Sequence, residues 1–326
     1  MNWGNKIILL TGGTGSFGQK FAEIMLKKHN PKTIRIFSRD ELKQWEMARK
    51  FDNNSRLRFF IGDVRDKDRL ERAMDGADIV VHAAALKQVT LCEYNPFEAV
   101  KTNIIGTQNV IEAAIDHNIE KVIAISTDKA VNPVNLYGAT KMSMEKICVA
   151  ANAYVGGKRK TKICCVRYGN VLKSRGSVIP LFMEQRNTGI VTVTDRRMTR
   201  FWVALESGVN FVIKCIEKMH GGEIFVPKVP SMRILDVVKT IAPTCKIKFI
   251  GIRPGEKIHE CLLTEDESRH SIEINDFFII EPEHIWWNRN KLTQHGKQLP
   301  EGFRYTSDKN DTWITSTDLK KTLQNQ

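Results

Sequence analysis

The sequence predicts an α/β fold: a Rossmann-type, doubly wound parallel sheet with a smaller C-terminal substrate-binding lobe. Three observations favour it. Short apolar runs alternate with helical patterns over the first half of the chain, which is typical of parallel strands joined by right-handed helical crossovers. The apolar runs are continuous, as expected for strands covered by helices on both faces. A glycine-rich turn follows the first run.

The elements can be assigned in chain order. We expect strands at 6–10, 33–38, 57–61, 79–83, 121–126 and 162–167, and helices at 17–29, 41–51, 67–74, 96–117 and through 141–151. Glycine and proline interrupt the pattern after residue 168, although 201–219 again reads as a helix. We therefore predict a cofactor-binding Rossmann domain over 1–170, to which 201–226 returns, and a substrate-binding lobe formed by 171–200 and 227–326.

Composition excludes several classes of protein. The 326 residues are 42% hydrophobic and 27% charged, as in ordinary globular proteins, and the net charge of +13 favours an anionic ligand. The sequence contains no basic run with interleaved aromatic residues, so it does not indicate nucleic-acid binding. The seven cysteines form no C-x-x-C pair, so we expect no metal site, no disulfide framework and a reducing compartment. No signal peptide or apolar stretch of roughly 18 residues is evident, so we expect a cytoplasmic protein without a membrane span.

The turn at residues 11–18 predicts a dinucleotide site. Its glycines stand three apart, where they permit a tight turn, close approach of a pyrophosphate and close packing of the helix on the strand. The helix that follows offers free N–H groups and a positive dipole end. The cofactor-binding residues expected here are Gly12, Thr14, Gly15, Ser16, Phe17 and Gly18.

The end of the second strand predicts the choice of cofactor. Ser38 and Arg39 stand there, with Lys43 just beyond. A guanidinium can make charge-assisted, often bidentate contacts to a 2′-phosphate, so we expect NADP. Asp40 keeps NAD open as the second choice, because a carboxylate at this place can bind the ribose diol.

The next two strand ends complete the expected cofactor site. Asp63 and Val64 follow the third strand, where the carboxylate can accept a hydrogen bond from an adenine amine. Ala83 and Ala85 follow the fourth strand, and their small side chains leave room for the cofactor. Lys87 comes next and could contact a phosphate or a sugar.

Tyr137 and Lys141 are the expected chemical centre. They stand four apart, so they share one helix face. A nearby ammonium and the nicotinamide cation both favour tyrosinate, so we expect the Tyr137 pKa to be lowered toward neutrality. The tyrosinate would then take a proton from a substrate hydroxyl while hydride passes to the nicotinamide.

This tyrosine and lysine, placed after Ser126-Thr127, resemble the extended short-chain dehydrogenase/reductase family over nearly the whole chain. Asp128-Lys129 narrows the resemblance. A 4-epimerase needs no further acid and base at this place, whereas a 4,6-dehydratase must remove the carbon 5 proton and expel the carbon 6 hydroxyl. The dTDP-glucose 4,6-dehydratases carry Asp-Glu here, and this chain departs from them at the carbon 5 base.

The chain instead resembles the inverting UDP-N-acetylglucosamine 4,6-dehydratases of the pseudaminic acid type. The motifs that carry this resemblance are Ser38-Arg39-Asp40-Glu41, Ala85-Leu86-Lys87-Gln88-Val89, Ser126-Thr127-Asp128-Lys129-Ala130, Asn132-Pro133, Tyr137-Gly138-Ala139-Thr140-Lys141, Arg167-Tyr168-Gly169-Asn170-Val171 and Arg253-Pro254-Gly255-Glu256-Lys257. The resemblance implies an NADP-dependent hydro-lyase whose 4-keto-6-deoxy product has the L-arabino configuration. It also implies a homo-oligomer, often a hexamer.

The resemblance assigns roles to the catalytic residues. Tyr137 is the base at the carbon 4 hydroxyl, and Lys141 lowers its pKa and holds the nicotinamide ribose. Lys129 is the carbon 5 base, for which a neutral amine is needed. Asp128 is the acid that protonates the leaving carbon 6 hydroxyl, and Thr127 hydrogen-bonds the sugar. Which of Asp128, Lys129 and Tyr137 reprotonates carbon 5 stays open.

The resemblance also locates the UDP-sugar. Residues after Asn170 and Val171, including Val178, cross the site, and the stretch from Thr194 to Arg200 holds the nucleotide. Arg253 and Glu256 correspond to contacts with the diphosphate and the ribose. Two alternatives remain: a UDP-sugar 4-epimerase or a 4,6-dehydratase of another nucleotide hexose, and a redox-sensing binding module, which commonly lacks the Tyr and Lys that this chain retains.

Overall fold

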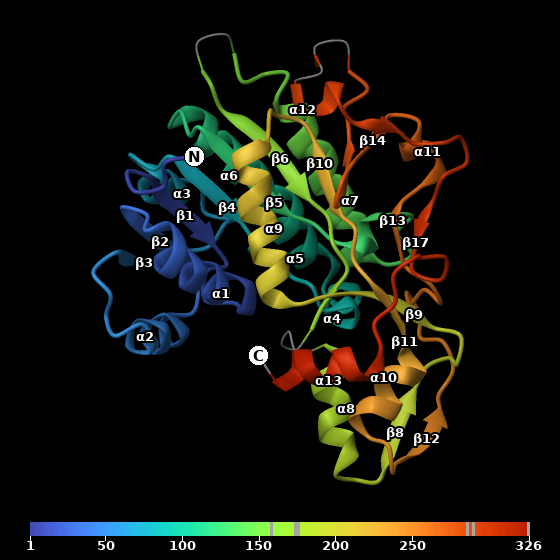
Figure 1. Cartoon of the computed structure of the whole chain (residues 1–326). Coiled ribbons are helices and arrows are strands. Elements are labelled where there is room, and N and C mark those ends of the chain that lie inside the picture. The colour runs from blue at the N-terminus through green and yellow to red at the C-terminus, as the bar shows by residue number, and fades with distance from the viewer. Residues whose placement is uncertain (157–158, 173–176, 285–286, 289–290, 325–326) are drawn as a thin grey trace.

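The computed structural model describes residues 1–156, 159–172, 177–284, 287–288 and 291–324. Figure 1 shows a large sheet with helices around it and a smaller lobe below, which is formed by segments from the second half of the chain.

Ten strands in the described part of the chain form the large sheet. Their order is β3-β2-β1-β4-β5-β6-β10-β15-β14-β16. The pairs from β3 to β10 are parallel, and β15, β14 and β16 add antiparallel strands at one edge. The strands are β1 Ile7–Thr11, β2 Thr33–Ser38, β3 Leu57–Ile61, β4 Ile79–His82, β5 Lys121–Ile125, β6 Lys162–Val166, β10 Ile224–Pro227, β14 Ser271–Ile274, β15 Phe277–Ile280 and β16 Lys297–Gln298.

The strand order reverses between β1 and β4, so their carboxyl ends open a crevice at the switch point. The apolar runs of these strands are buried on both faces; Ile8, Leu9 and Leu10 are fully buried, for example. This confirms the predicted Rossmann-type sheet and places its ligand crevice at the glycine-rich turn after β1.

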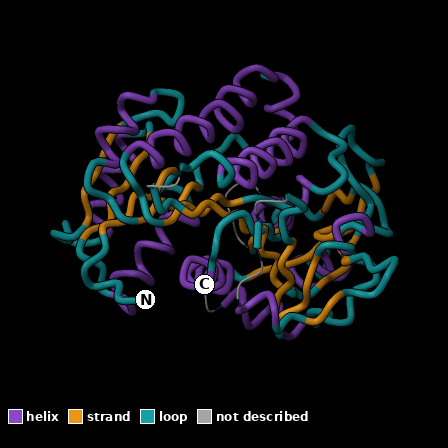
Figure 2. The backbone as a smooth tube through the Cα atoms, turned by 90° about the horizontal axis from the view of Figure 1, so that it is seen from above, coloured by secondary structure: helices purple, strands orange, loops and turns teal. Residues whose placement is uncertain are grey.

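Helices cover both faces of this sheet (Figure 2). One group, α3, α6 and α7, packs side by side, and α1 packs against α9. The helical segments, including π (η1, η2) and 3-10 (η3) turns, are α1 Ser16–Ile24, η1 Met25–His29, α2 Glu41–Lys50, α3 Lys67–Met74, α4 Val89–Tyr94, α5 Pro96–Val100, η2 Lys101–Ile105, α6 Gly106–Asp116, η3 Asp128–Ala130, α7 Leu136–Ala151, α8 Val178–Arg186, α9 Leu205–Lys218, α10 Ile234–Ile241, α11 Glu265–Ser268, α12 Lys291–Gln294 and α13 Ser316–Gln324.

The smaller lobe has its own hydrophobic core. Helices α8, α10 and α13 pack around the two-stranded pair of β8 and β12. Its buried side chains include Phe182, Val193, Trp202, Val237 and Leu319. The remaining strands are β7 Asn170–Val171, β8 Ile190–Val193, β9 Thr199–Val203, β11 Ser231–Arg233, β12 Lys246–Phe249, β13 Cys261–Leu263 and β17 Tyr305–Thr306.

The structure corrects two of the predicted elements. Residues 201–203 belong to strand β9, which pairs with β7 and β11, and the helix begins only at Leu205. The long helix expected at 96–117 is interrupted by the π-helical turn η2. In both places apolar residues continue through a change of backbone conformation, which periodicity alone does not reveal.

The expected division into domains stays a prediction, but the sheet pairing bears on it in one place. Strands β14 and β15, from the segment expected in the lobe, hydrogen-bond to β10 and extend the large sheet. Segment 205–218 packs against α1, on the Rossmann part.

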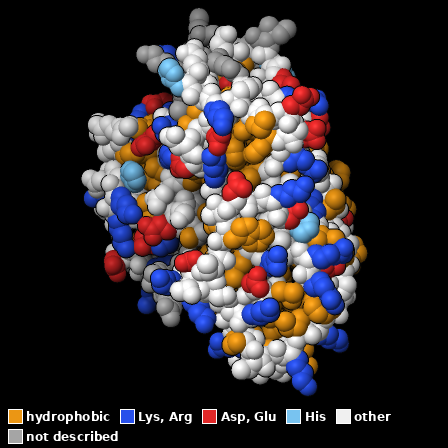
Figure 3. Space-filling model, turned by 45° about the vertical axis from the view of Figure 1, so that its right-hand side comes forward, with side chains coloured by type: hydrophobic (Ala, Val, Ile, Leu, Met, Phe, Trp, Pro, Cys, Tyr) orange, Lys and Arg blue, Asp and Glu red, His pale blue; other side chains and the backbone are white. Residues whose placement is uncertain are grey.

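The surface bears on the expected ligands. On the face seen in Figure 3, Lys and Arg side chains are scattered among acidic and uncharged ones, without a single basic stripe. Among the described residues, no helix has both the length and the apolar character that crossing a bilayer requires.

Candidate active site

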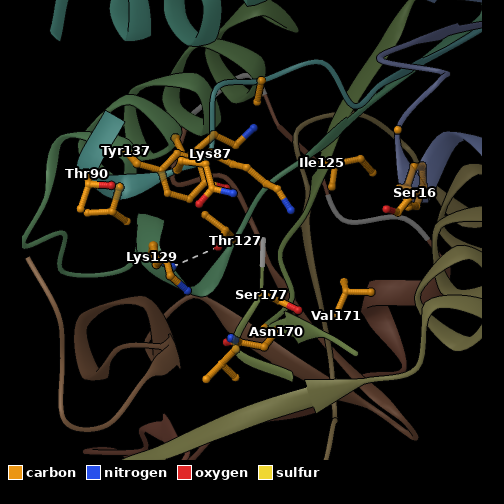
Figure 4. A pocket seen from close by; sticks show the side chains of 18 of the residues that line it. Ser16, Lys87, Thr90, Ile125, Thr127, Lys129, Tyr137, Asn170, Val171 and Ser177 are labelled. Carbon is orange, nitrogen blue, oxygen red and sulfur yellow. Dashed lines mark hydrogen bonds between the residues drawn. The ribbon is translucent and has the colours of Figure 1, made fainter. Parts of the chain in front are cut away.

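A cleft of about 1380 Å³ lies between the carboxyl ends of the parallel strands and the lobe. Figure 4 places Ser16 toward one end of it and Thr90, Tyr137 and Lys129 toward the other, with Thr127 between them. The cleft therefore brings the predicted cofactor turn and the predicted chemical centre into one cavity.

The glycine-rich turn is shaped for close backbone approach. Gly12 has φ +67°, and a Cβ there would lie 2.8 Å from the backbone N of Ala84. A Cβ at Gly18 would lie 2.4 Å from the carbonyl O of Gly13, so this glycine serves helix packing and does not line the cleft. The other residues expected here line the cleft: Gly12, Thr14, Gly15, Ser16 and Phe17.

The end of β2 presents positive charge to the cleft. Ser38, Arg39 and Lys43 all line it. Asp40 lines the cleft as well, but its carboxylate caps α2 by accepting from the backbone N of Lys43 at 3.0 Å, and it pairs with the Lys43 ammonium. The carboxylate that keeps NAD open is thus already occupied in holding the helix.

The ends of β3 and β4 differ in how they meet the cleft. Val64, Ala83, Ala85 and Lys87 line it. Asp63 does not; its carboxylate accepts from Arg65 at 2.7 Å and lies 3.6 Å from Arg39. Arg65 holds the pKa of Asp63 below its usual value against the effect of burial, so this side chain positions Arg39 by charge.

Helix α7 carries Tyr137 and Lys141 into the cleft. The Asn135 side chain caps the helix by accepting from the backbone N of Gly138 at 2.8 Å. Tyr137 is 9% exposed and Lys141 is 3% exposed. The Lys141 ammonium donates to Met144 Sδ at 2.9 Å.

The protonation of the two side chains differs from the expectation. Burial raises the pKa of Tyr137 to about 12, although the Lys129 charge and a hydrogen bond with Thr127 act against it. Burial lowers the pKa of Lys141 to about 8. The protein alone therefore does not bring the Tyr137 pKa toward neutrality, and the ammonium that acts on Tyr137 is that of Lys129.

The turn η3 places Thr127, Asp128 and Lys129 beside Tyr137. The Thr127 hydroxyl donates to Asp128 Oδ1 at 2.9 Å, and the Lys129 ammonium donates to the same oxygen at 3.0 Å. Gly138 allows this approach, because a Cβ there would lie 2.1 Å from the Lys129 carbonyl O. Thr127 and Lys129 line the cleft, whereas Asp128 is fully buried behind them. Its Oδ2 has no hydrogen-bond partner among the described residues.

The lobe side of the cleft carries the residues expected for the UDP-sugar. Asn170, Val171, Val178, Thr194, Arg200, Arg253 and Glu256 all line it. Within the part of the chain that the structure describes, the side-chain Oδ1 of Asn170 and Oε2 of Glu256 are buried without a hydrogen-bond partner, so both have capacity for a polar ligand. Residues 173–176 of the segment expected to cross the site lie outside the described residues.

Sequence reasoning missed a second group of charged residues in the cleft. Glu260 and Lys257 line it, and Glu260 Oε1 lies 3.7 Å from the Lys129 ammonium and 3.6 Å from Arg200 Nε. Lys257 was named only as the last residue of a motif, and no role was assigned to it. No local pattern marks Glu260, because it meets Lys129 across more than a hundred residues of chain.

A buried charge network behind the cleft was also missed. Arg167 donates to Glu145 at 2.6 and 3.0 Å and to Glu267 at 2.9 and 3.0 Å. Glu145 in turn accepts from the Ser126 hydroxyl at 2.5 Å. This network joins β5, β6, α7 and α11, and it supports the backbone from which Thr127 and Tyr137 project.

Comparison with known proteins agrees with this site. The family described as polysaccharide biosynthesis protein matches residues 8–282. The chain belongs to this family. A UDP-N-acetylglucosamine 4,6-dehydratase (inverting) from Campylobacter jejuni is 49% identical over 322 residues, which cover 96% of this chain and 96% of the relative. The predicted membership of the extended short-chain dehydrogenase/reductases is confirmed.

Two further relatives frame the family. A UDP-glucose 4-epimerase from Rickettsia conorii is 45% identical over 284 residues, or 85% of this chain and 83% of the relative. The X-ray structure of Pen from Bacillus thuringiensis has a TM-score of 0.91 and 39% identity, and the match covers 100% of this chain and 99% of that one. The fold and the arrangement of its two parts thus recur in a solved structure of similar length.

Proposed function

We propose that the chain is an NADP-dependent UDP-N-acetylglucosamine 4,6-dehydratase, a hydro-lyase that inverts carbon 5 of the sugar. The observation that carries the proposal is the ion pair of Asp128 and Lys129, 3.0 Å long, beside Tyr137. Oxidation at carbon 4 needs one base, whereas loss of water across carbons 5 and 6 needs a further acid and base. The 49% identical relative from Campylobacter jejuni supports the same reaction.

The residues present fit a phosphorylated dinucleotide. The turn at Gly12 leaves room for backbone alone against Ala84, as a pyrophosphate contact requires. Arg39 and Lys43 would hold the 2′-phosphate, and Lys141 the nicotinamide ribose. Bound NADP supplies the acceptor for the carbon 4 hydride and the donor that returns it to carbon 6.

Tyr137 removes the proton of the carbon 4 hydroxyl. Its pKa of about 12 in the protein alone makes this step dependent on positive charge in the cleft. The Lys129 ammonium provides part of it, and the oxidised nicotinamide ring would add more. The Thr127 hydroxyl, which contacts both Tyr137 and Asp128, keeps the phenol oriented.

The Asp128–Lys129 pair becomes reactive by one internal proton transfer. The two carboxylates around Lys129 favour its ammonium form and raise its pKa above the usual value, although burial alone would lower it. Transfer of one ammonium proton to Asp128 breaks an N–H bond, forms an O–H bond and leaves a neutral amine and a carboxylic acid.

The amine then removes the proton at carbon 5, which the carbon 4 ketone acidifies. The proton of Asp128 goes to the carbon 6 hydroxyl, which leaves as water. Because Asp128 lies behind Thr127, we expect the Thr127 hydroxyl to pass this proton into the cleft. Lys129 ends as an ammonium and Asp128 as a carboxylate, so the pair is restored.

The reaction is tested by incubating the purified protein with NADP and UDP-N-acetylglucosamine in deuterated water and following the sugar by NMR. We expect a 4-keto-6-deoxy product with deuterium at an inverted carbon 5. A product in which the configuration at carbon 5 is retained would contradict the proposed inversion.

The second candidate is a UDP-sugar 4-epimerase, favoured by the 45% identical Rickettsia relative of that activity. The same incubation separates the two, since a 4-epimer forms without loss of water. If the protein turns over only another nucleotide hexose, the assignment of the substrate changes, whereas the assignment as a dehydratase stays.

The cofactor preference is tested by calorimetry. We expect NADP to bind at least tenfold more tightly than NAD, because Arg39 lines the cleft at the end of β2 and the Asp40 carboxylate there is engaged by Lys43. Tighter binding of NAD would overturn this preference. The homo-oligomer and the cytoplasmic location stay predictions; light scattering of the purified protein measures the first.

A further inference from the structure

Glu260 is a buried carboxylate that lines the cleft, and one of its oxygens has no hydrogen-bond partner among the residues that the structure describes. It precedes β13 and is 3% exposed. Its Oε1 lies 3.7 Å from Lys129 Nζ and 3.6 Å from Arg200 Nε, and its Oε2 lies 4.0 Å from Lys257 Nζ. These separations exceed hydrogen-bond length, and Oε2 has no hydrogen-bond partner.

The carboxylate is held in this place by its backbone and by its neighbours. The backbone N of Glu260 donates to the Ser307 hydroxyl at 2.9 Å, and the Ser307 N donates to the Glu260 carbonyl at 2.8 Å. Arg200 is fixed by donating to the carbonyls of Ile258 and Lys257, both at 2.9 Å. The long ion pairs of Glu260 therefore belong to a well-anchored arrangement.

A purely structural role does not explain this geometry. A buried carboxylate contributes to stability when its lone pairs are filled at hydrogen-bond distance, and it is costly when they are not. Among the described residues, Glu260 Oε2 has no hydrogen-bond partner, while Oε1 lies 3.7 Å from the Lys129 ammonium. Such incomplete satisfaction is typical of residues that act on a site.

We infer that Glu260 is a positioning residue of the chemical site, which holds the Lys129 amine between two carboxylates and governs its exchange of protons. The inference rests on the proposed dehydratase function, in which Lys129 must pass between ammonium and amine. Glu260 stays beside Lys129 when Asp128 takes the proton. Glu260 thereby keeps the amine in place. It pairs with the ammonium again once Lys129 has taken the carbon 5 proton.

The charges around Lys129 determine what its removal does. The groups that face Lys129 are Asp128 from its own turn, Glu260 and Lys257 from the segment before β13, Arg200 from β9, Lys87 from the loop after β4, and Tyr137 from α7. Without Glu260, the Asp128 carboxylate alone offsets the three cations near Lys129, which are those of Lys257, Arg200 and Lys87. The Lys129 pKa should then fall by about one unit or more, which raises the amine fraction about tenfold.

The test measures the amine directly. Lys129 is 26% exposed and lines the cleft, so a small acylating reagent can reach it. The NADP-loaded full chain and its Glu260→Gln variant would be acylated between pH 7 and 10, and modification of each lysine would be quantified by peptide mass spectrometry. We expect Lys129 to react about tenfold faster in Glu260→Gln at pH 9.

A matched control lies outside the cleft. Lys228 pairs with Glu273 at 2.5 Å, and the two side chains are 34% and 29% exposed. Glu273→Gln should change the reactivity of Lys228 and leave that of Lys129 unchanged. Glu260→Asp shortens the side chain by one methylene and should give an intermediate acylation rate at Lys129. This variant replaces Glu260→Gln if Glu260→Gln unfolds below the assay temperature.

The second readout is turnover of UDP-N-acetylglucosamine. We expect kcat to fall about tenfold in Glu260→Gln, with KM changed less than twofold and partial recovery in Glu260→Asp. Unchanged Lys129 reactivity, or raised reactivity with an unchanged kcat, would overturn the inference. An inactive wild type would refute the proposed function instead, and the acylation rates would still decide whether Glu260 governs Lys129.

Discussion

Two charge clusters, one around Arg167 and one around Glu260, contact the segment 126–129 that carries the chemical centre, and they are built differently. Around Arg167, each guanidinium contact to Glu145 and Glu267 is 2.6–3.0 Å long. Around Glu260, the contacts to cations are 3.6–4.0 Å long, and one oxygen has no hydrogen-bond partner. The first cluster is closed, and the second is open toward the cleft.

The difference teaches how one protein uses buried charge in two ways. A closed cluster has its hydrogen bonds filled, so it fixes the elements that it joins. An open cluster keeps groups available for proton transfer at the cost of stability. Mutations in the two clusters should therefore affect stability and turnover in opposite proportion.

The largest expected effect is on turnover in the open cluster. Lys129→Met removes the carbon 5 base and should lower kcat by about 10²- to 10⁴-fold, the range for loss of a general acid or base. The measurement is steady-state turnover of UDP-N-acetylglucosamine with NADP present. Near-normal turnover would refute the assignment of Lys129 as the base.

The next effect is on stability in the closed cluster. Arg167→Leu leaves the buried Glu145 and the partly exposed Glu267 without their shared partner, and should lower the free energy of unfolding by about 3 kcal/mol. Urea unfolding measures it. Arg197→Leu is the control, because its pair with Asp195 lies on the surface and its loss should hardly change stability. Equal losses of unfolding free energy in both variants would show that the closed cluster stabilises the fold no more than a surface ion pair does.

How far the sequence predicted these clusters depends on how local their signals are. The cofactor turn was predicted because Gly12 and its neighbours are contiguous and the pyrophosphate contacts backbone. Tyr137 and Lys141 were predicted because a helix brings residues four apart together. Strand β2 has its predicted bounds, Thr33–Ser38, since its apolar run ends at turn residues.

The remaining features depend on contacts that the sequence does not display. Glu260 meets Lys129 and Arg200 only after the lobe folds over the sheet. The pKa of Tyr137 was expected to fall, yet burial raises it, and burial is a property of the packed chain. Residues 201–203 form a strand because β7 and β11 flank them, which no window of sequence around them indicates.

The pH dependence of stability should distinguish the clusters by a smaller effect. Burial alone would raise the pKa of Glu267, but Arg167 outweighs it and the pKa is lowered from 4.5. A lowered folded-state pKa contributes stability above about pH 4.5, and this contribution is lost as pH falls through the folded-state value. Arg167→Leu removes it, so the stability gap to wild type should stay constant down to about pH 5 and narrow as the pH falls below about 4.5. A constant gap in urea unfolding would contradict this.

The smallest effect is expected where the cleft meets solvent. The Arg253 side chain is 48% exposed and lies 4.0 Å from Glu256, so it belongs to neither cluster. If it contacts the diphosphate of the substrate, Arg253→Ala should raise KM for the UDP-sugar about three- to tenfold and leave kcat nearly unchanged, because the contact is equal in ground and transition states. Arg269→Ala is the control, because Arg269 pairs with Asp266 on the surface and does not line the cleft. A fall in kcat at constant KM would instead connect Arg253 to the open cluster, through the segment that joins it to Lys257 and Glu260.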